Sequence, residues 1–349
     1  MSIIDNTTPL KLGYVGIGRY LPPHILTNED LERLVDTSDE WIKQRTGINT
    51  RHIMGPEDSV ANMATEAARE AIEHAGIDKS QISTIQIGVN THIRFPSLAA
   101  IVSKRLGIKN ASSVDICAGC SAFIFSVENI YHRLQSEWLT MGKKSYGLAI
   151  GVDGLSLIVD WEDRGTCVLF GDAAGAAVIG PVENGEILAT FTRTHGEYDD
   201  LLYLDEFLKI PYHNTDEMQP EIFKSCKYPF MRMDGRKVFQ VAVRSMISDI
   251  RTVMERYNKM SGENIKLSDI GYVIPHQANL RIVSAVQKGL DLTDDKVYRD
   301  GIINYGNTSS ASIPLGYCDT WGKMPGALVV DVAFGAGFAS GAILRKNPK

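Results

Sequence analysis

Short apolar runs alternate along this chain with longer segments in which apolar residues recur at helical spacing. The runs that predict strands in the first half are LGYVGIG, IQIGVN, SVDIC, YGLAIGVD and GAAVIGP. Helices are expected near residues 58–76, 97–106 and 121–137. Strands and helices that alternate in this way are typical of an α/β fold.

The alternation resumes after about residue 184. Strands are expected at ILATFTRT, at GYVIPHQAN and within ALVVDVAFGAGFASGAILRK, and a long helix at RKVFQVAVRSMISDIRTVMERY. Residues 196–234 are irregular and mixed in charge, which we interpret as a lid or a connector. We therefore expect two similar α/β halves, residues 1–184 and 185–349, although no literal repeat is visible.

Two short helices near the N-terminus carry the spacing of a capping box. Thr27 stands three residues before Asp30, and Thr37 stands three residues before Glu40. Because such pairs satisfy free N–H groups at a helix start, helices should begin at TNEDLERLV and TSDEWIKQR.

Composition narrows the class of protein. The chain has 349 residues, 44% hydrophobic and 22% charged, which is enough to build two cores. A net charge of −6 makes nucleic acid an unexpected ligand. The sequence shows no secretory leader and no run of about 18 apolar residues, so we expect a cytoplasmic protein without a membrane span.

The five cysteines are odd in number and scattered, which fits a reducing compartment better than a disulfide framework. The segment SVDICAGCSAFIFSVENIYHRL predicts a strand, a Gly-containing turn and a helix that begins beside Cys120. Free N–H groups and the helix dipole should stabilise a thiolate there and lower its pKa. Most cysteines are simply buried hydrophobes, but this context favours a nucleophile.

Cys117 and Cys120 also form a C-x-x-C pair, which leaves a redox pair or half of a zinc site as alternatives. The other cysteines stand singly, and a thioredoxin unit is far smaller than this chain. We therefore interpret Cys117 as a strand residue.

His276 and Asn307 are the candidates to work with the thiol. His276 follows an apolar strand in GYVIPHQANLRI, and strand ends in α/β folds are where ligands bind. Asn307 follows Gly306 in INYGNTSSASIP, just before a helix start rich in small residues. Taken singly, the histidine would more often be structural, and the Gly-Asn pair would be an ordinary turn.

Two kinds of chemistry fit a thiol, an imidazole and a carboxamide. In thiol hydrolases the histidine deprotonates the cysteine, and the asparagine orients the histidine. In decarboxylative condensation both side chains donate hydrogen bonds to a thioester carbonyl and stabilise the enolate that forms. Spacing alone does not separate the two.

The chain resembles the β-ketoacyl-acyl-carrier-protein (ACP) synthase III family from one end to the other. The landmarks are GIGRYLPPHILTNEDLERLVDTSDEWIKQRTGINTRHI, FPSLAA, DICAGCSAF, DRGTCVLFGDAAGAAV, VIPHQANLRI, YGNTSSASIP and FGAGFASGAIL. The resemblance implies a duplicated, five-layer α-β-α-β-α thiolase-like fold, a homodimer, and condensation of an acyl-CoA starter with malonyl-ACP. It implies no metal or redox cofactor.

The resemblance also implies roles for individual residues. Cys120 would carry the acyl group while His276 and Asn307 promote decarboxylation, and the backbone N–H groups of Cys120 and Ala336 would form the oxyanion hole. The remaining implied contacts are Trp41, Arg45 and Arg164 with the adenine of coenzyme A, Asn279 with the pantetheine arm, Arg281 with ACP, and Phe95 with the acyl pocket of the partner subunit.

Two positions depart from the family pattern. Ala122 stands where the family usually has Gly, and Ala336 interrupts a glycine triplet. Alanine keeps its N–H donor but restricts the backbone. We expect an enzyme that initiates fatty-acid synthesis; the runner-up is a relative that uses longer or unusual acyl groups in secondary metabolism. A non-decarboxylating acyltransferase, a thioesterase and a non-catalytic dimer partner stay as alternatives from other classes.

Overall fold

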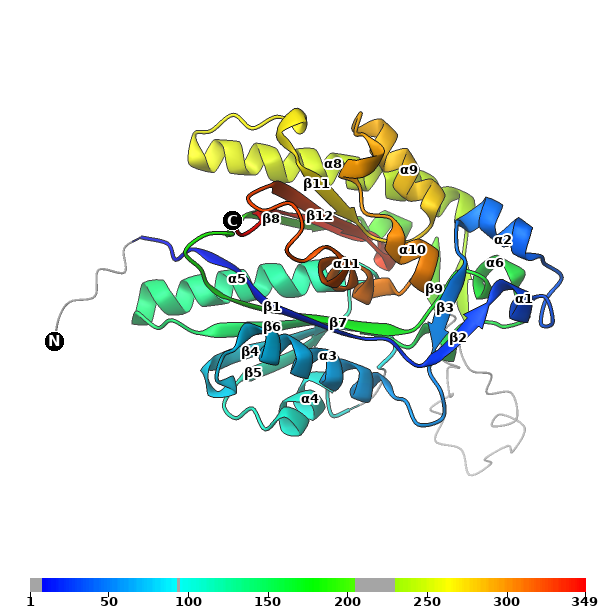
Figure 1. Ribbon diagram of the computed structural model, residues 1–349, viewed down its shortest axis with the longest axis horizontal. Helices are drawn as coiled ribbons and strands as arrows, with labels where there is room; N and C mark the ends of the chain where they lie inside the picture. The colour runs from blue at the N-terminus through cyan, green and yellow to red at the C-terminus, as the bar shows by residue number, and fades with distance from the viewer. Residues whose placement is uncertain (1–7, 93–94, 205–229) are drawn as a thin grey trace, which may run out of the picture.

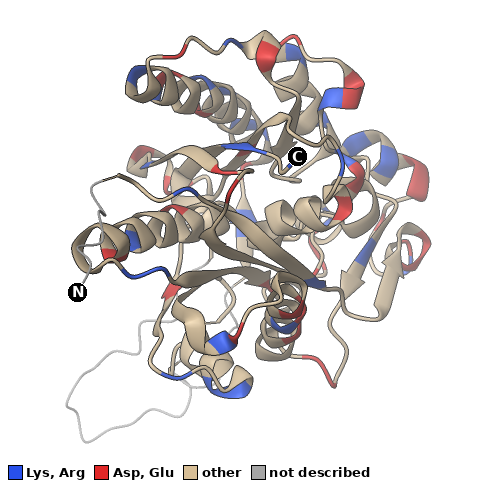
Figure 2. Cartoon of the chain, turned by 60° about the vertical axis from the view of Figure 1, so that its left-hand side comes forward, with Lys and Arg blue, Asp and Glu red and all other residues tan. Residues whose placement is uncertain are grey.

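The computed structural model describes residues 8–92, 95–204 and 230–349. Two β-sheets alternate with three layers of helices, so that one helical layer lies between the sheets and one covers each outer face (Figure 1). Lys, Arg, Asp and Glu are intermixed along the outer helices (Figure 2).

The first sheet has five strands, and three of them are parallel. Its order is β1 (Leu12–Tyr20), β7 (Ala173–Pro181), β6 (Tyr146–Asp153), β4 (Ile82–Gly88) and β5 (Ser112–Ile116). β7 is antiparallel to both its neighbours, whereas β6, β4 and β5 run parallel. Strands β4, β6 and β7 are buried almost throughout, because helices cover both faces of this sheet.

The second sheet repeats most of this order. Its strands are β8 (Ile187–Thr194), β13 (Ala339–Lys346), β12 (Leu328–Phe334) and β11 (Tyr272–Pro275). β13 is antiparallel to both its neighbours, and β12 is parallel to β11. A single parallel bridge from Val273 to Val297 stands where the first sheet has β5.

The helices repeat as well. α3 (Val60–Ala75) and α4 (Leu98–Leu106) cover the first sheet, and α8 (Gly235–Ser261) and α9 (Leu280–Gly289) cover the second. α5 (Ala122–Met141) and α11 (Ser312–Thr320) lie between the sheets and contact both. Phe123, Ile124, Val127 and Ile130 of α5 are fully buried, as a central helix requires.

A group of small elements lies at one end of the sandwich, on the right of Figure 1. It contains β2 (His24–Thr27), α1 (Asn28–Leu31), α2 (Asp39–Thr46), β3 (Thr50–Ile53), α6 (Arg164–Cys167), β9 (Leu202–Leu204), β10 (Met231–Met233) and α10 (Asp300–Tyr305). β2 pairs with β3, and β9 pairs with β10. The pair β9–β10 comes from the two described ends of the expected lid or connector; residues 205–229 lie outside the described residues.

Most expected elements are present, with two corrections. The box at Thr27 and Asp30 is confirmed, but the box at Thr37 is wrong, because Ser38 caps α2 and accepts a hydrogen bond from the Trp41 N–H. Cys117 is not a strand residue, since β5 ends at Ile116. The connection from β7 to β8 spans residues 182–186, so the expected division between residues 184 and 185 falls within it and stays a prediction.

Candidate active site

Cys120 lies at the sharp turn between β5 and α5. Gly119 has a φ of +55°, which favours glycine, and α5 begins two residues after the cysteine. The thiol is 9% exposed, and Ser309 Oγ lies 3.4 Å from its sulfur. The expected strand, elbow and helix are therefore present at this cysteine.

The buried carboxylate of Asp153 is connected to this turn through hydrogen bonds of Asn90. Asp153 is fully buried and accepts hydrogen bonds from Asn90 Nδ2 at 3.0 Å and Ser310 Oγ at 2.9 Å. The same Asn90 Nδ2 donates to the Gly119 carbonyl at 3.1 Å. One amide thus joins the carboxylate to the residue that precedes Cys120.

The pKa of the Cys120 thiol differs from the expectation. Burial raises this pKa to about 12, the hydrogen bond from Ser309 lowers it, and the charge of Asp153 raises it further. The expectation of a lowered pKa is therefore wrong, since loss of hydration outweighs the helix start. The thiol is neutral at pH 7.

His276 follows β11 and is 1% exposed. Its Nδ1 lies 2.6 Å from Ser312 Oγ, and its ring packs edge-on against Phe334 at 5.7 Å between centroids. Burial lowers the pKa of His276 to about 3, so the imidazole is neutral across the physiological range.

Asn307 is held in place by its neighbours along the chain. Its backbone pairs with the segment around Phe170, because its N–H donates to the Leu169 carbonyl at 2.8 Å. Its Oδ1 accepts a hydrogen bond from the Ser309 N–H at 2.9 Å. The amide oxygen is thereby occupied, which leaves Nδ2 as the donor available to a ligand.

Two backbone segments meet beside the sulfur. A Cβ on Gly119 would lie 2.3 Å from the Ala336 nitrogen, and a Cβ on Gly335 would lie 2.2 Å from the Cys120 nitrogen. Only glycine permits such an approach. The Cys120 and Ala336 N–H groups are therefore close neighbours, as the predicted oxyanion hole requires.

One cavity of about 250 Å³ joins these groups to the surface. Cys120, His276 and Asn307 all line it, with Phe334 beside them. Its other lining residues are Trp41, Arg45, Thr46, Gly165, Val168, Leu169, Phe170, Leu202, Met233, Gly235, Val238, Phe239, Ala278, Asn279 and Ile282. The wall is mostly apolar with a few polar groups at its end, which is typical of a substrate site.

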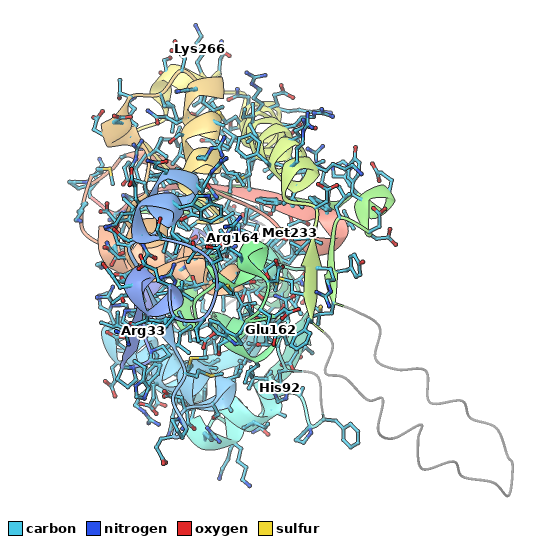
Figure 3. The ribbon with its side chains drawn as sticks, turned by 90° about the vertical axis from the view of Figure 1, so that its right-hand side faces the viewer. Arg33, His92, Glu162, Arg164, Met233 and Lys266 are labelled. Atoms are coloured by element: carbon cyan, nitrogen blue, oxygen red, sulfur yellow. The ribbon has the colours of Figure 1, made fainter. Side chains whose placement is uncertain are left out.

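The residues expected to hold coenzyme A gather at the mouth of this cavity. The guanidinium carbon of Arg164 lies 4.7 Å from the centre of the Trp41 ring, and that of Arg45 lies 6.0 Å from it. Asn279 caps α9 and donates from Nδ2 to the Arg45 carbonyl at 3.2 Å. Arg164 of α6 and Met233 of β10 lie close to one another (Figure 3).

The other two candidate residues lie outside the cavity. Arg281 is exposed on α9, where it lines a shallow groove with Lys43 and Lys288. Phe95 is 95% exposed and does not line the cavity of its own chain. Its predicted role in a partner's pocket stays a prediction.

Several site residues were not found from the sequence. Ser309 contacts the sulfur and has a φ of +50°, which is uncommon for a non-glycine residue and marks functional sites, and Ser312 contacts His276. Both belong to the run TSSAS, where the only signal was a cluster of small polar residues. Asp153 carried no signal beyond its place at a strand end.

The alternatives for the cysteines can be compared with the structure. Cys117, Cys120, Cys167 and Cys318 are free thiols, and Cys226 lies outside the described residues. Within the described part of the chain, no three His, Cys, Asp or Glu side chains gather as metal ligands would.

No helix in the described part of the chain is long and apolar enough to cross a membrane.

Comparisons with known proteins agree on one family. Residues 114–196 match 3-oxoacyl-[acyl-carrier-protein] synthase III, and residues 260–346 match the C-terminal part of that family. The β-ketoacyl-ACP synthase III of Campylobacter fetus is 38% identical over 96% of this chain and 98% of its own length. The chain belongs to the β-ketoacyl-ACP synthase III family.

Solved structures confirm the expected thiolase-like fold. The synthase III of Aquifex aeolicus is 38% identical, with a TM-score of 0.83 over 96% of this chain and 99% of the other. The priming β-ketosynthase of the R1128 polyketide pathway is 27% identical, with a TM-score of 0.84 over 98% of both chains. The protein is thus a condensing enzyme of the acyltransferase type.

The structure gives a reason for one departure from the family pattern. A Cβ on Gly88 would lie 2.8 Å from the Ala122 Cβ, so the missing side chain on β4 leaves room for the alanine methyl. No neighbouring contact explains Ala336, which is half-buried.

The raised pKa predicts how Cys120 reacts with an alkylating agent. Only the thiolate attacks, and well below the pKa its fraction rises tenfold per pH unit. We expect the rate of Cys120 alkylation by iodoacetamide to rise about tenfold per unit between pH 6 and 9 without a plateau, because its pKa is about 12. Peptide mass spectrometry separates Cys120 from the exposed Cys117. A plateau near pH 7 would show instead that the helix start sets the pKa.

Proposed function

We propose that the protein starts fatty-acid synthesis by loading an acyl group from acyl-CoA onto Cys120 and condensing it with malonyl-ACP. The observation that carries this proposal is the single cavity that Cys120, His276 and Asn307 line together, with Trp41 and Arg45 at its mouth. Its cationic and aromatic mouth suits a nucleotide, and its apolar wall suits a pantetheine arm.

Loading is the first step. The Cys120 thiol gives its proton to solvent, and its sulfur attacks the thioester carbonyl of acyl-CoA, so that a tetrahedral oxyanion forms. The N–H groups of Cys120 and Ala336 donate to that oxygen. The intermediate then expels the coenzyme A thiolate, which takes up a proton, and the acyl group remains on Cys120.

Condensation follows when malonyl-ACP occupies the same cavity. The malonyl carboxylate leaves as carbon dioxide, and its electron pair forms an enolate at the thioester oxygen. His276 Nε2 and Asn307 Nδ2 donate hydrogen bonds to that oxygen. The enolate carbon attacks the acyl-cysteine carbonyl, and collapse of the intermediate releases 3-oxoacyl-ACP and the Cys120 thiolate.

The hydrogen bonds around the histidine favour condensation over hydrolysis. A thiol hydrolase would require hydrogen bonds from the histidine to the cysteine and to the asparagine. Among the described residues, no hydrogen bond joins His276 to Cys120 or to Asn307. Because Ser312 Oγ already accepts from the Gln277 N–H at 3.5 Å, we assign its hydroxyl as the donor to His276 Nδ1, which places the imidazole proton on Nε2. Two neutral donors then remain for a developing oxyanion.

We propose two macromolecular partners. Arg281, Lys43 and Lys288 line one groove on α2 and α9, which provides a local cationic surface for an acidic carrier protein. A second copy of the chain would pair with the exposed edge of β5, where Val114 is 45% exposed, and would bring the exposed Phe95 to the neighbouring pocket.

A role in secondary metabolism is the second candidate. The R1128 priming ketosynthase matches this chain as well in shape as the Aquifex synthase does, with TM-scores of 0.84 and 0.83. A mass-spectrometric panel of acyl-CoA starters, from acetyl to octanoyl, separates the two candidates. Preference for acetyl-CoA supports ordinary initiation, and preference for octanoyl-CoA supports the specialised role.

The first substitution that tests the mechanism is Cys120→Ala. It should abolish acyl loading and condensation, because alanine has no nucleophile to form the thioester. Intact-protein mass after incubation with acetyl-CoA measures the adduct. Cys117→Ala is the matched control and should load normally. An adduct of normal amount on the Cys120 variant would contradict the role of Cys120 as the acyl carrier. Loss of loading in the Cys117 variant would support the alternative in which Cys117 and Cys120 act as a pair.

His276→Ala and Asn307→Ala should separate the two steps. Each removes one donor to the enolate, and such a loss typically slows a reaction by about a hundred- to a thousandfold. We expect malonyl-ACP decarboxylation to fall by this factor in each variant, while loading of Cys120 from acetyl-CoA falls much less. The release of labelled carbon dioxide measures the first step. Equal losses in both steps would point to a base role for His276 in loading.

The carrier-protein groove is tested by Arg281→Glu. The reversal of charge should reduce activity with malonyl-ACP more than activity with malonyl-pantetheine, since only the carrier is acidic. Rising salt should lower wild-type activity with the carrier and barely change the variant. Lys266→Glu is a charge-matched control, because Lys266 lies far from Arg164 at the cavity mouth (Figure 3). Equal losses with both malonyl donors would place Arg281 in the active site instead.

A further inference from the structure

Three polar side chains meet beneath the second sheet, away from the cavity; two of them are buried, and the third, Arg193, is 29% exposed. Arg193 of β8 and Ser340 of β13 stand opposite one another across the two strands, and Asp249 of α8 faces them. Asp249 is fully buried and Ser340 is 1% exposed. Arg193 Nη2 lies 2.6 Å from Asp249 Oδ1. We refer to these three residues as the α8 clamp.

The clamp is not explained as a stabilising ion pair. Although the two charges are close, neither Asp249 oxygen has a well-aligned hydrogen bond from a described residue, and Arg193 Nε also lacks one. Burial raises the pKa of Asp249, while the Ser340 hydroxyl and the charges of Arg193 and His195 lower it. An ion pair whose carboxylate is buried with incomplete hydrogen bonding is often less stabilising than apolar residues of the same size.

The position of the α8 clamp indicates a role other than stability. β13 begins at Ala339, directly after the turn at Ala336–Phe338. The Ala339 carbonyl accepts hydrogen bonds from the Gly335 N–H at 2.7 Å and from Ser121 Oγ at 3.0 Å. Ser340 comes next in the chain, so the clamp lies at the end of β13 that holds the turn against the nucleophile.

The end of β8 also contacts this turn. Thr194 pairs with Ala339, and the His195 N–H donates to the Phe338 carbonyl at 3.1 Å. Arg193 directly precedes these two residues. The ion pair to Asp249 therefore connects the end of β8, and through it the turn, to the 27-residue helix α8.

We propose that Arg193 and Asp249 are positioning residues that fix the start of β13 and thereby hold the Ala336 N–H in place beside Cys120. The inference rests on the proposed function, in which this N–H stabilises the oxyanion of loading. Such a donor must lie within a few tenths of an ångström of its working position. A strand end connected only to its neighbouring strand would allow larger movements than one connected to a long packed helix.

The test compares single variants with an apolar double variant. Arg193→Met leaves the buried Asp249 carboxylate unpaired and should lower the melting temperature, whereas Asp249→Leu leaves the partly exposed Arg193 unpaired and should lower it less. The double variant Arg193→Met/Asp249→Leu has no buried charge and should melt close to wild type. Its loading rate from acetyl-CoA at saturation should nevertheless fall about tenfold or more, with KM for acetyl-CoA within about twofold of wild type, since a displaced donor affects only the oxyanion.

A second ion pair, at the far end of β13, provides the control. Arg345 Nε donates to Asp331 Oδ2 at 2.8 Å, and both residues are buried. Arg345→Met/Asp331→Leu should leave loading unchanged, because Arg345 lies six residues from Ala339 along β13 and Asp331 lies in the middle of β12. An Arg193→Lys variant keeps the positive charge beside Asp249. It should therefore load at most of the wild-type rate, in contrast to the double clamp variant.

The outcomes separate the inference from the proposed function. A double clamp variant that melts like wild type and loads at the wild-type rate overturns the clamp alone. A loading rate that falls equally in the Arg345 and Asp331 control also overturns it, because any buried pair would then have the same effect. A wild-type protein that takes up no acyl group on Cys120 would overturn both.

Discussion

The site depends on one contact between two glycine-containing backbone segments. Gly119 and Cys120, at the start of α5, lie against Gly335 and Ala336, at the end of β12, so closely that a Cβ on either glycine would overlap a backbone nitrogen. The first segment follows a strand of the first sheet, and the second follows a strand of the second sheet. The proposed oxyanion hole therefore depends on the approach of the two sheets across the central helices.

Burial decides the charge of every group around that contact. The same loss of water raises the pKa of Cys120 to about 12 and lowers that of His276 to about 3, so thiol and imidazole are both neutral at pH 7. The end of the cavity at Cys120 and His276 therefore carries no charge on either group before reaction. In such a buried place, fixed N–H donors would act more strongly on a developing oxyanion than they would in water.

Sequence reasoning succeeded where the signal was local. Hydrophobic periodicity predicted β6 and β8 to the residue, and glycine beside a helix start marked Cys120. It failed where neighbours compete: Ser38 rather than Thr37 caps α2, because the N–H of Trp41 lies within reach of its hydroxyl. The pKa of Cys120 was predicted in the wrong direction, since the sequence shows the helix start but not the depth of burial.

Contacts between distant segments could not be read from the chain. Ser309 is 189 residues from the sulfur that it contacts, and Ser312 is 36 residues from His276. A serine in a small-residue run carries no sign of either role, whereas the family resemblance supplied Trp41 and Arg164 because their motif is long. The predicted contact of Phe95 would be made in the pocket of a second chain, and in its own chain the ring is 95% exposed.

The repeated strand order explains why the nucleophile and its donors come from different parts of the sequence. α5 and α11 occupy equivalent places between the sheets, each directly before the last two strands of its own sheet. Cys120 precedes α5, and Asn307 and Ser309 precede α11, so the starts of two equivalent helices converge on one sulfur. In the first position the turn carries the proposed nucleophile, Cys120; in the second it carries Asn307, whose amide we propose binds the substrate carbonyl. A duplicated fold can thus divide the two tasks between equivalent turns, because a change in one turn leaves the local structure of the other intact.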